Sequence, residues 1–170
     1  ETRTASIVAK RLRDLGLEVR ENVGKTGVVG VLRGAHDGPC VLVRADMDAL
    51  PIHEENEWEW KSKTRGLMHA CGHDAHTAIG LSVARILAGE RETLRGTVKF
   101  MFQPAEEGMG GAGVMIEDGL LENPRPDFAL ALHVWSQIEA GKIGVSSGPV
   151  MACADEFRAL ILGKGGHGAI

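Results

Sequence analysis

Short apolar segments rich in β-branched residues alternate with amphipathic segments along the chain, and this alternation constrains the fold more than any other feature. Strands are expected at residues 27–32, 41–43, 98–102 and 128–134, with a turn at 34–39 between the first two. Helices are expected at residues 5–16, 77–87 and 114–121, and a long polar loop at 51–68. Strands that are apolar on both faces, with helices between them, indicate an α/β fold in which helices cover a sheet.

The apolar pattern is interrupted near residues 146–149, where Ser, Gly and Pro gather, and this interruption predicts a domain boundary. The first domain is expected to cover residues 1–150, and a second to begin in residues 151–170. In the second domain, residues 157–162 alternate like a strand, and a glycine-rich turn follows them. Because the pattern is still running when the sequence stops at Ile170, we expect the chain to be a fragment.

Composition and charge exclude several classes of protein. The net charge is −4 and the basic residues are scattered, whereas a nucleic-acid-binding protein carries a basic stripe. No stretch approaches the length of uncharged apolar residues, about 18, that a membrane span needs. The three cysteines are odd in number and far apart, and the first residues lack the character of a signal peptide. We therefore expect a cytoplasmic protein with neither nucleic acid nor membrane as a partner.

The densest concentration of chemically active side chains lies in residues 68–76, which hold Cys71, His73 and two further histidines. Thiolate and imidazole are the ligands that zinc-like divalent metals prefer. Gly72 permits a tight backbone between Cys71 and His73, so both donor atoms can point to one centre. The pattern favours a metal site. The alternatives are a buried structural cysteine beside exposed histidines, and a cysteine hydrolase with Cys71 as its nucleophile.

A pair of acids follows the strand expected at 98–102. On a regular strand, Glu106 and Glu107 would point to opposite faces. Pro104 and Gly108 interrupt the strand, however, so both carboxylates can reach one pocket. A hydrolytic metal site needs one carboxylate that binds metal and another that moves protons. The alternative is a solvated acidic turn.

Polar side chains also end two other predicted strands. His133 closes the apolar run that begins at Phe128, and Asp46 and Asp48 follow the strand at 41–43. His133 can be a ligand or a hydrogen-bonded core residue. The two aspartates can be ligands, residues that orient a histidine, or parts of a turn. Strand ends are where α/β folds place their sites, which favours the functional interpretation.

Three motifs of this sequence together resemble one family. Residues 44–51 read Arg-Ala-Asp-Met-Asp-Ala-Leu-Pro, residues 69–77 read His-Ala-Cys-Gly-His-Asp-Ala-His-Thr, and residues 103–108 read Gln-Pro-Ala-Glu-Glu-Gly. They resemble the amidohydrolase branch of the aminoacylase/carboxypeptidase-type dinuclear metallopeptidases, which includes hippurate hydrolases, N-acyl-amino-acid amidohydrolases and plant auxin-conjugate hydrolases. The resemblance implies a three-layer α/β/α zinc-peptidase-like catalytic domain, followed by the start of an α+β ferredoxin-like lid domain.

The resemblance also implies the site and its chemistry. Two divalent ions (Mn, Zn, Co or Ni) would be bound by Cys71, His73, Glu107 and His133. Glu106 would be the general base that activates a bridging water and later protonates the leaving amine. Asp46 and Asp48 would have supporting roles. The family's fifth ligand is a histidine that this chain lacks, so the chain by itself is expected to be inactive.

The reaction expected from the resemblance is cleavage of the amide bond of small N-acyl amino acids, such as N-acetyl or hippurate-like substrates. His167 resembles a lid-domain histidine that polarises the scissile carbonyl, and the parent enzyme is expected to be a homodimer through that domain. The alternatives are an aminopeptidase or dipeptidase of the same clan, and a catalytically incompetent metal-binding fragment. The remaining histidines are expected at the surface or in supporting positions; they are His36, His53, His69 and His76.

Overall fold

The computed structural model describes residues 1–108, 110–153, 155 and 157–169. They form two compact units, Glu1–Val134 and Trp135–Ile170, and every described helix and strand belongs to the first unit. In chain order the elements are α1 (Thr2–Asp14), β1 (Glu18–Val23), β2 (Gly27–Arg33), β3 (His36–Asp46), α2 (His73–Gly89), β4 (Arg95–Gln103), α3 (Gly111–Glu117) and β5 (Phe128–Ala131). None of the described helices is long and apolar enough to cross a membrane.

The five strands form one mixed sheet in the order β1-β2-β4-β3-β5. β2 pairs antiparallel with β1 and with β4, whereas β3 pairs parallel with β4 and with β5. In the parallel pairs, Asp46 lies beside Gln103 and Arg44 lies beside Ala131. The carboxyl ends of β3, β4 and β5 therefore meet at one edge of the sheet, which is where α/β folds place their sites.

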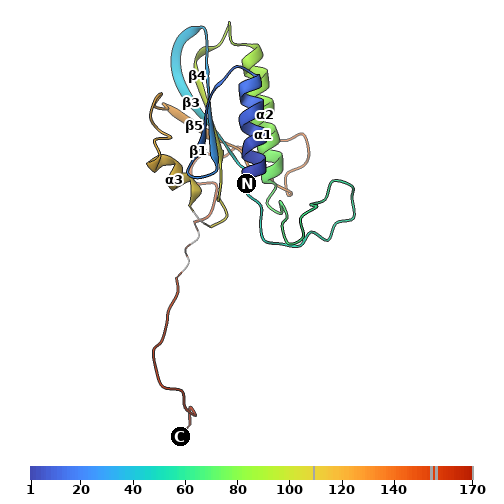
Figure 1. The fold of residues 1–170 in the computed structure, drawn as a ribbon, viewed down its shortest axis with the longest axis vertical. Helices are drawn as coiled ribbons and strands as arrows, with labels where there is room; N and C mark the ends of the chain where they lie inside the picture. Colours follow the sequence, from blue (N-terminus) through green and yellow to red (C-terminus); the bar gives the residue numbers. More distant parts are fainter. Residues whose placement is uncertain (109, 154, 156, 170) are drawn as a thin grey trace. The chain divides into compact units, whose positions relative to one another are not determined.

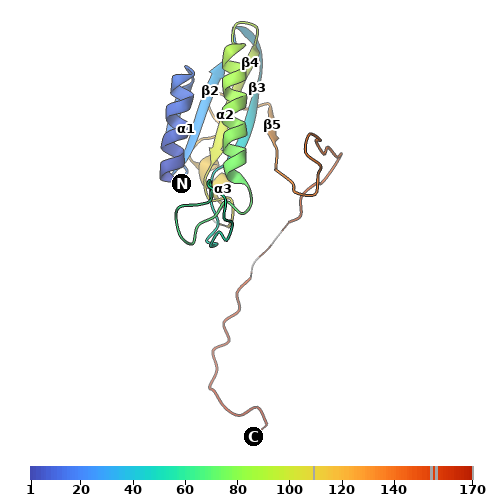
Figure 2. The ribbon, with the colours of Figure 1, turned by 90° about the vertical axis from the view of Figure 1, so that its right-hand side faces the viewer.

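Helices cover both faces of the sheet, with α1 and α2 side by side on one face and α3 on the other (Figures 1 and 2). The core beneath α1 and α2 includes Leu12, Val28 and Phe100, all fully buried. The core on the face of α3 includes Met101 and Met115. Side chains alternate along β4, so Phe100 and Met101 serve opposite cores. The α/β fold expected from the sequence, with helices on both faces, is confirmed for the first unit.

The strands differ from the sequence-based expectation in two places. Segment 34–39 is not a turn between paired neighbours, because β3 begins at His36 and β4 lies between β2 and β3. His36 already pairs with Arg95 of β4, and a register shift before Cys40 accommodates the intervening glycine and proline. β1 is a strand that the sequence pattern does not reveal, because it is an edge strand whose residues are mostly exposed and polar.

Helix α2 begins at His73, earlier than the expected start at Thr77. Gly72 precedes the helix in the left-handed conformation, with φ of 82°. The hydroxyl of Thr77 donates to the carbonyl oxygen of His73 at 2.9 Å, a bond within the first turn. The earlier start places His73 and His76 one turn apart on the same helix face.

The second unit contains no helix or strand among its described residues. The strand expected at 157–162 is not formed, and Phe157 and Ile161 are each 92% exposed. An alternating sequence becomes a strand only when a neighbouring strand pairs with its backbone, and no described segment pairs with this one. The start of a lid domain is therefore not evident, and the assignment of residues 151–170 to a second domain stays a prediction.

Candidate metal centre

The polar residues that the sequence singled out gather at the carboxyl edge of the parallel strands. Asp46 ends β3, His73 begins α2, Glu106 and Glu107 follow β4, and His133 follows β5. The long loop between β3 and α2 is closed at its base by two backbone hydrogen bonds between Leu50 and Met68, of 2.9 and 3.0 Å. This closure brings the segment just after β3 next to the segment that leads into Cys71.

His73 is the centre of the cluster and is fully buried. Its Nδ1 lies 3.0 Å from Oδ1 of Asp48, so a neutral ring donates its proton there and keeps its lone pair on Nε2. Three carboxylate oxygens surround this Nε2, from Asp46 at 3.7 Å, Glu107 at 3.8 Å and Glu106 at 3.9 Å. Both Nε2 of His73 and Oδ2 of Asp46 are buried without a hydrogen-bond partner among the described residues.

Cys71 and His133 complete the group. Sγ of Cys71 lies 3.4 Å from Nε2 of His133, and the ligand atoms of these two residues and His73 all lie within 4.8 Å of one another. Nδ1 of His133 donates to the carbonyl oxygen of Val134 at 2.7 Å, which leaves its lone pair on Nε2. Burial, and then the neighbouring carboxylates with Glu107 first, raise the pKa of the Cys71 thiol to about 11.

This donor set fits a divalent cation. A buried polar atom without a hydrogen-bond partner costs about 1–3 kcal/mol and is rare in folded proteins. Here two such atoms, each with a lone pair, face one another across 3.7 Å, from His73 and Asp46. A cation among imidazole, thiolate and carboxylate groups would satisfy both atoms and offset the charge of the acids.

The contact between Cys71 and His133 also resembles the pair of a cysteine hydrolase. A nucleophilic thiol needs a pKa that is lowered by positive charge or by a helix N-terminus. The surroundings of Cys71 do the opposite, because burial and the nearby carboxylates raise the pKa of the thiol to about 11. The electrostatics therefore favour Cys71 as a ligand, which loses its proton when a cation binds, over Cys71 as a nucleophile.

Arg44 is a cation at the edge of this acidic cluster that the sequence reasoning missed. Its Nη2 lies 3.1 Å from Oδ2 of Asp46 and 3.8 Å from Oε1 of Glu106, and its Nε donates to Gln103 at 2.7 Å. This ion pair offsets part of the charge of Asp46 without giving Oδ2 a hydrogen bond. The sequence did contain a signal for this contact: Arg44 and Asp46 are two residues apart, and residues two apart on a strand point to the same face.

Of the remaining histidines, His76 and His69 each contact an aspartate of the cluster, and His76 is buried. Its Nδ1 lies 2.5 Å from Oδ1 of Asp46, and its Nε2 accepts the backbone N–H of Val134 at 2.9 Å. Nδ1 of His69 donates to the carbonyl oxygen of Asp48 at 3.1 Å. His73 and His76 are three residues apart, so both rings lie on one helix face. This spacing is the sequence signal that could have predicted the burial of His76 beside His73.

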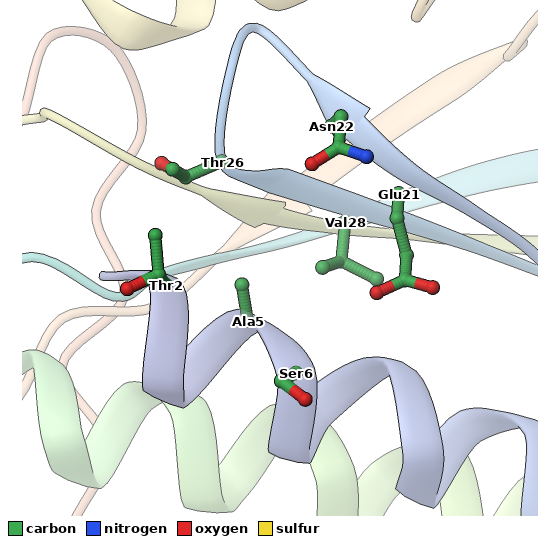
Figure 3. A pocket seen from close by; sticks show the side chains of 7 residues that line it. All are labelled: Thr2, Ala5, Ser6, Glu21, Asn22, Thr26 and Val28. Carbon is green, nitrogen blue, oxygen red and sulfur yellow. The ribbon is translucent and has the colours of Figure 1, made fainter.

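A small pocket on the first unit is separate from this cluster. Figure 3 shows it between the start of α1 and the hairpin of β1 and β2; it is lined by Thr2, Ala5, Ser6, Glu21, Asn22, Thr26 and Val28. Two of its polar groups already have partners in the fold, because Glu21 binds Arg13 and Thr26 donates to Glu1 at 3.0 Å. None of its lining residues carries an imidazole or a thiol, so it lacks the nitrogen and sulfur ligands that zinc-like ions prefer.

His167 lies in the second unit and is exposed. Its Nδ1 accepts a hydrogen bond from the backbone N–H of Ala169 at 3.1 Å, as a histidine in a glycine-rich turn does. All the other expected site residues belong to the first unit. A role for His167 at the scissile carbonyl therefore stays a prediction.

The chain is similar to known proteins over nearly its whole length. It is 45% identical to Thermostable carboxypeptidase 1 of Saccharolobus solfataricus, over 99% of this chain and 43% of that protein. It is 46% identical to N-acyl-L-amino acid amidohydrolase of Geobacillus stearothermophilus, over 100% of this chain and 46% of that protein. The structure of the Bacillus subtilis YXEP protein, a dinuclear metal binding peptidase from the M20 family, matches with a TM-score of 0.82 and 40% identity, over 88% of this chain and 41% of that chain.

These matches confirm the resemblance that the three motifs indicated. The chain spans less than half the length of each of the three proteins. The family model for peptidase family M20/M25/M40 matches residues 42–159, which is more than half of the chain and includes the whole cluster around His73. Sequence motifs, fold and site thus agree with the family match, and this chain belongs to peptidase family M20/M25/M40.

Proposed function

We propose that this chain is the metal-binding part of an amidohydrolase that cleaves the amide bond of N-acyl amino acids. One observation carries the proposal: Nε2 of His73 is buried, has no hydrogen-bond partner among the described residues, and has three carboxylate oxygens within 3.9 Å. A buried lone pair beside acids calls for a cation. The 46% identity to an N-acyl-L-amino acid amidohydrolase supports the substrate class.

We assign the binding of two divalent ions (Mn, Zn, Co or Ni) to four residues: Cys71, His73, Glu107 and His133. The similarity to YXEP, a dinuclear metal binding peptidase, supports a pair of ions. Asp48 supports two of these ligands at once, because it accepts Nδ1–H of His73 and the backbone N–H of Glu107, each at 3.0 Å. Asp46 also supports the centre. Arg44 contacts its Oδ2 and His76 contacts its Oδ1, so both contacts orient the carboxylate of Asp46.

Glu106 is the proposed general base. When bound, a pair of divalent ions lowers the pKa of a water molecule and polarises the amide carbonyl. Glu106 takes the proton of the attacking water and passes it to the leaving nitrogen. Its Oε2 lies 3.9 Å from Nε2 of His73 and its side chain is 37% exposed, so it combines nearness to the centre with access to water. Arg44, 3.8 Å away, holds the carboxylate at this place.

The contacts of the two glutamates support different roles. Glu107 lies beside the thiol of Cys71, whose pKa it raises, and its backbone is tied to Asp48. Glu106 instead contacts Arg44 and is the more exposed of the two, 37% against 26%. A ligand needs a fixed position among other ligands, whereas a general base must exchange protons with water. We therefore assign metal binding to Glu107 and proton transfer to Glu106.

A peptidase is the second candidate, because a relative with 45% identity is a carboxypeptidase. In either case we propose that His167 polarises the scissile carbonyl of the whole protein, and that residues 151–170 belong to a lid through which it dimerises. A substrate panel separates the two activities: N-acetyl- and N-benzoyl-amino acids are compared with unblocked dipeptides. A preference of about tenfold or more in kcat/KM for the N-acyl amino acids supports the amidohydrolase, and the reverse preference supports the peptidase.

Metal content tests the centre in this chain. Purified under reducing conditions and loaded with Zn²⁺ or Mn²⁺, the chain is expected to retain about one or two equivalents, as a dinuclear site requires. Cys71→Ser is expected to retain less. Cys153→Ser, at an exposed cysteine of the second unit, is the matched control and should retain as much as the native chain. No bound metal in the native chain, or equal retention by Cys71→Ser, would contradict the proposal.

Glu106→Gln tests the general base in the whole protein. The amide cannot accept a proton, so we expect kcat to fall by about 10²- to 10⁴-fold while metal content stays unchanged. Glu117→Gln, at an exposed position in α3, is the matched control. Turnover of Glu106→Gln close to that of the native protein would rule out this assignment.

A further inference from the structure

His76 uses both of its ring nitrogens in hydrogen bonds inside the fold. Nδ1 lies 2.5 Å from Oδ1 of Asp46, and Nε2 accepts the backbone N–H of Val134 at 2.9 Å. A backbone N–H only donates, so Nε2 is the acceptor and the proton of the ring is on Nδ1, directed at Asp46. No lone pair of His76 is left for a cation. Although Asp46, His73 and His76 offer ligand atoms within 4.8 Å of one another, His76 therefore connects groups and does not bind metal.

The bond to Val134 fixes the segment that carries His133. The pairing of β5 with β3 ends at Ala131, before this segment. The peptide N–H of Val134 is held by His76, and its carbonyl oxygen accepts the Nδ1 proton of His133 at 2.7 Å. His133 consequently presents the lone pair of Nε2 to Sγ of Cys71 at 3.4 Å. The rings of His76 and His133 also meet edge to face, with centroids 4.6 Å apart.

The side chain of Val134 rests on the turn between Cys71 and His73. Gly72 in this turn has a φ of 82°, and a Cβ added there would lie only 2.4 Å from Cγ2 of Val134. Glycine alone leaves room for this approach and adopts the conformation without strain. Val134 is thus held through its backbone by His76 and through its side chain by the turn that carries two of the proposed ligands.

The other bond of His76 occupies Oδ1 of Asp46, so that Oδ2, which also pairs with Arg44 at 3.1 Å, is the oxygen that faces His73. Oδ1 faces His76, and the remaining Oδ2 lies 3.7 Å from Nε2 of His73. The rings of His73 and His76 stack with centroids 5.4 Å apart, so the two histidines also fix each other's orientation. One side chain thereby sets two groups around the centre, Oδ2 of Asp46 and Nε2 of His133.

We propose that His76 is a positioning residue of the metal centre, whose two hydrogen bonds fix the orientations of His133 and Asp46 before metal binds. This inference rests on the proposed function, since the two groups matter there as parts of a metal site. Ligands that are oriented beforehand bind a cation more tightly, because binding then costs little reorganisation.

Two variants separate the hydrogen bonds of His76 from the shape of its ring. His76→Phe keeps the ring and removes both nitrogens. His76→Gln loses the ring but offers an amide N–H to Asp46 and an amide oxygen to Val134. Co²⁺ is titrated into the chain under reducing conditions, and the thiolate-to-cobalt charge-transfer absorption of Cys71 is followed.

We expect His76→Phe to bind Co²⁺ about 10- to 100-fold more weakly than the native chain, with a weaker charge-transfer band, and His76→Gln to recover most of the affinity. If His76 served only the fold, its substitution would change the free energy of unfolding but leave the charge-transfer band of the folded, Co²⁺-loaded chain unchanged. Native affinity and a native band in folded His76→Phe would therefore overturn the proposal. His53→Phe, at an exposed histidine, is the matched control.

A metal-free measurement keeps the failure of this inference distinct from the failure of the proposed function. Imidazole ¹H–¹⁵N spectra in chelator report the tautomer of His133, which is expected to be Nδ1–H in the native chain and in His76→Gln. In His76→Phe we expect a mixture of tautomers, and an unchanged His133 would overturn the proposal. A native chain that binds no Co²⁺ overturns the proposed function instead. Urea unfolding shows which variants are folded, and His76→Ala replaces His76→Phe if the latter does not fold.

Discussion

Lys99 in β4 and His73 at the start of α2 are both buried, but the fold treats their polar atoms in opposite ways. The ammonium of Lys99 donates to the carbonyl oxygens of Glu122 and Pro124, at 2.7 and 3.0 Å. Nε2 of His73 has no hydrogen-bond partner among the described residues and faces Oδ2 of Asp46, which has none either. A buried polar group with partners inside the chain serves the fold, whereas one without them marks a place that a ligand completes.

The two regions also differ in what their charges cost. Burial lowers the pKa of the Lys99 ammonium, so the fold tolerates this cation at some expense and uses it to hold the loop after α3 to the sheet. Around His73 the charge is negative, since Asp46, Glu106 and Glu107 all approach Nε2. We therefore expect substitutions of Lys99 to change stability without changing metal binding, and substitutions of His73 to change metal binding more than the stability of the metal-free chain.

The largest effect on stability is expected for Lys99→Ala, which should lower the free energy of unfolding by about 3–4 kcal/mol. The substitution removes three buried methylene groups together with the ammonium, and leaves the carbonyl oxygens of Glu122 and Pro124 without their donor. Lys99→Met keeps most of the side-chain volume and removes only the donor, so it should lose about 1–2 kcal/mol. Urea unfolding in chelator measures both values. If Lys99→Met is as stable as the native chain, the hydrogen bonds of Lys99 do not explain its burial.

A smaller effect, which depends on added metal, is expected at His73. Free Zn²⁺ at about 100 times its Kd should raise the free energy of unfolding of the native chain by about 2.7 kcal/mol. His73→Ala should abolish this rise. In chelator the same variant should lose less stability than Lys99→Ala, because removal of the buried Nε2 without a partner offsets part of the cost of losing the bond from Nδ1 to Asp48. Urea unfolding with Zn²⁺ and with chelator gives the four values. If Zn²⁺ raised the free energy of unfolding of His73→Ala as much as that of the native chain, the contrast drawn between His73 and Lys99 would be wrong.

The smallest effect is expected at the surface pair of Glu18 and Arg33, where water can replace either partner. Nε of Arg33 donates to Glu18 at 2.7 Å, but the two side chains are 54% and 64% exposed. The Arg33 guanidinium lowers the pKa of Glu18, so the pair stabilises the fold above the ordinary pKa of a glutamate and stops doing so as the pH falls through the lowered value. After solvent screening, its contribution is about a few tenths of a kcal/mol.

Glu18→Gln measures this contribution. The difference in free energy of unfolding between the native chain and the variant should be small at neutral pH and vanish in acid, once Glu18 is protonated in both the folded and the unfolded chain. A loss of more than about 1 kcal/mol at neutral pH would show that exposure does not weaken this pair, and would remove the basis for ranking it below the buried groups.

The members of the cluster were largely predictable from the sequence. Cys71, His73 and His133 were chosen for their ligand chemistry and their places beside strand or helix ends, and the structure brings these three together. This worked because the carboxyl ends of parallel strands converge, so chemistry at several strand ends lands in one place. The comparison with known proteins then confirmed the family that the motifs indicated.

The partners of individual atoms were not predictable. Lys99 in the middle of a strand reads as a side chain that faces water, and its burial depends on carbonyl oxygens of Glu122 and Pro124 that a distant loop supplies. His76 reads equally well as a surface residue, and only the folded chain puts Val134 and Asp46 on its two nitrogens. These contacts join residues that no local pattern relates to one another.

The sequence by itself determined which side chains carry chemistry, which segments tend to form strands or helices, and which family the chain belongs to, since residue types and short spacings hold that information. The tertiary structure decided which strands pair and which buried atoms lack partners. It placed β4 between β2 and β3, and it left residues 157–162 without a strand despite their alternating pattern. The pairing of two strands, and the hydrogen bonding of a buried polar atom, each need two segments of the chain. They are therefore decided only when folding brings those segments together.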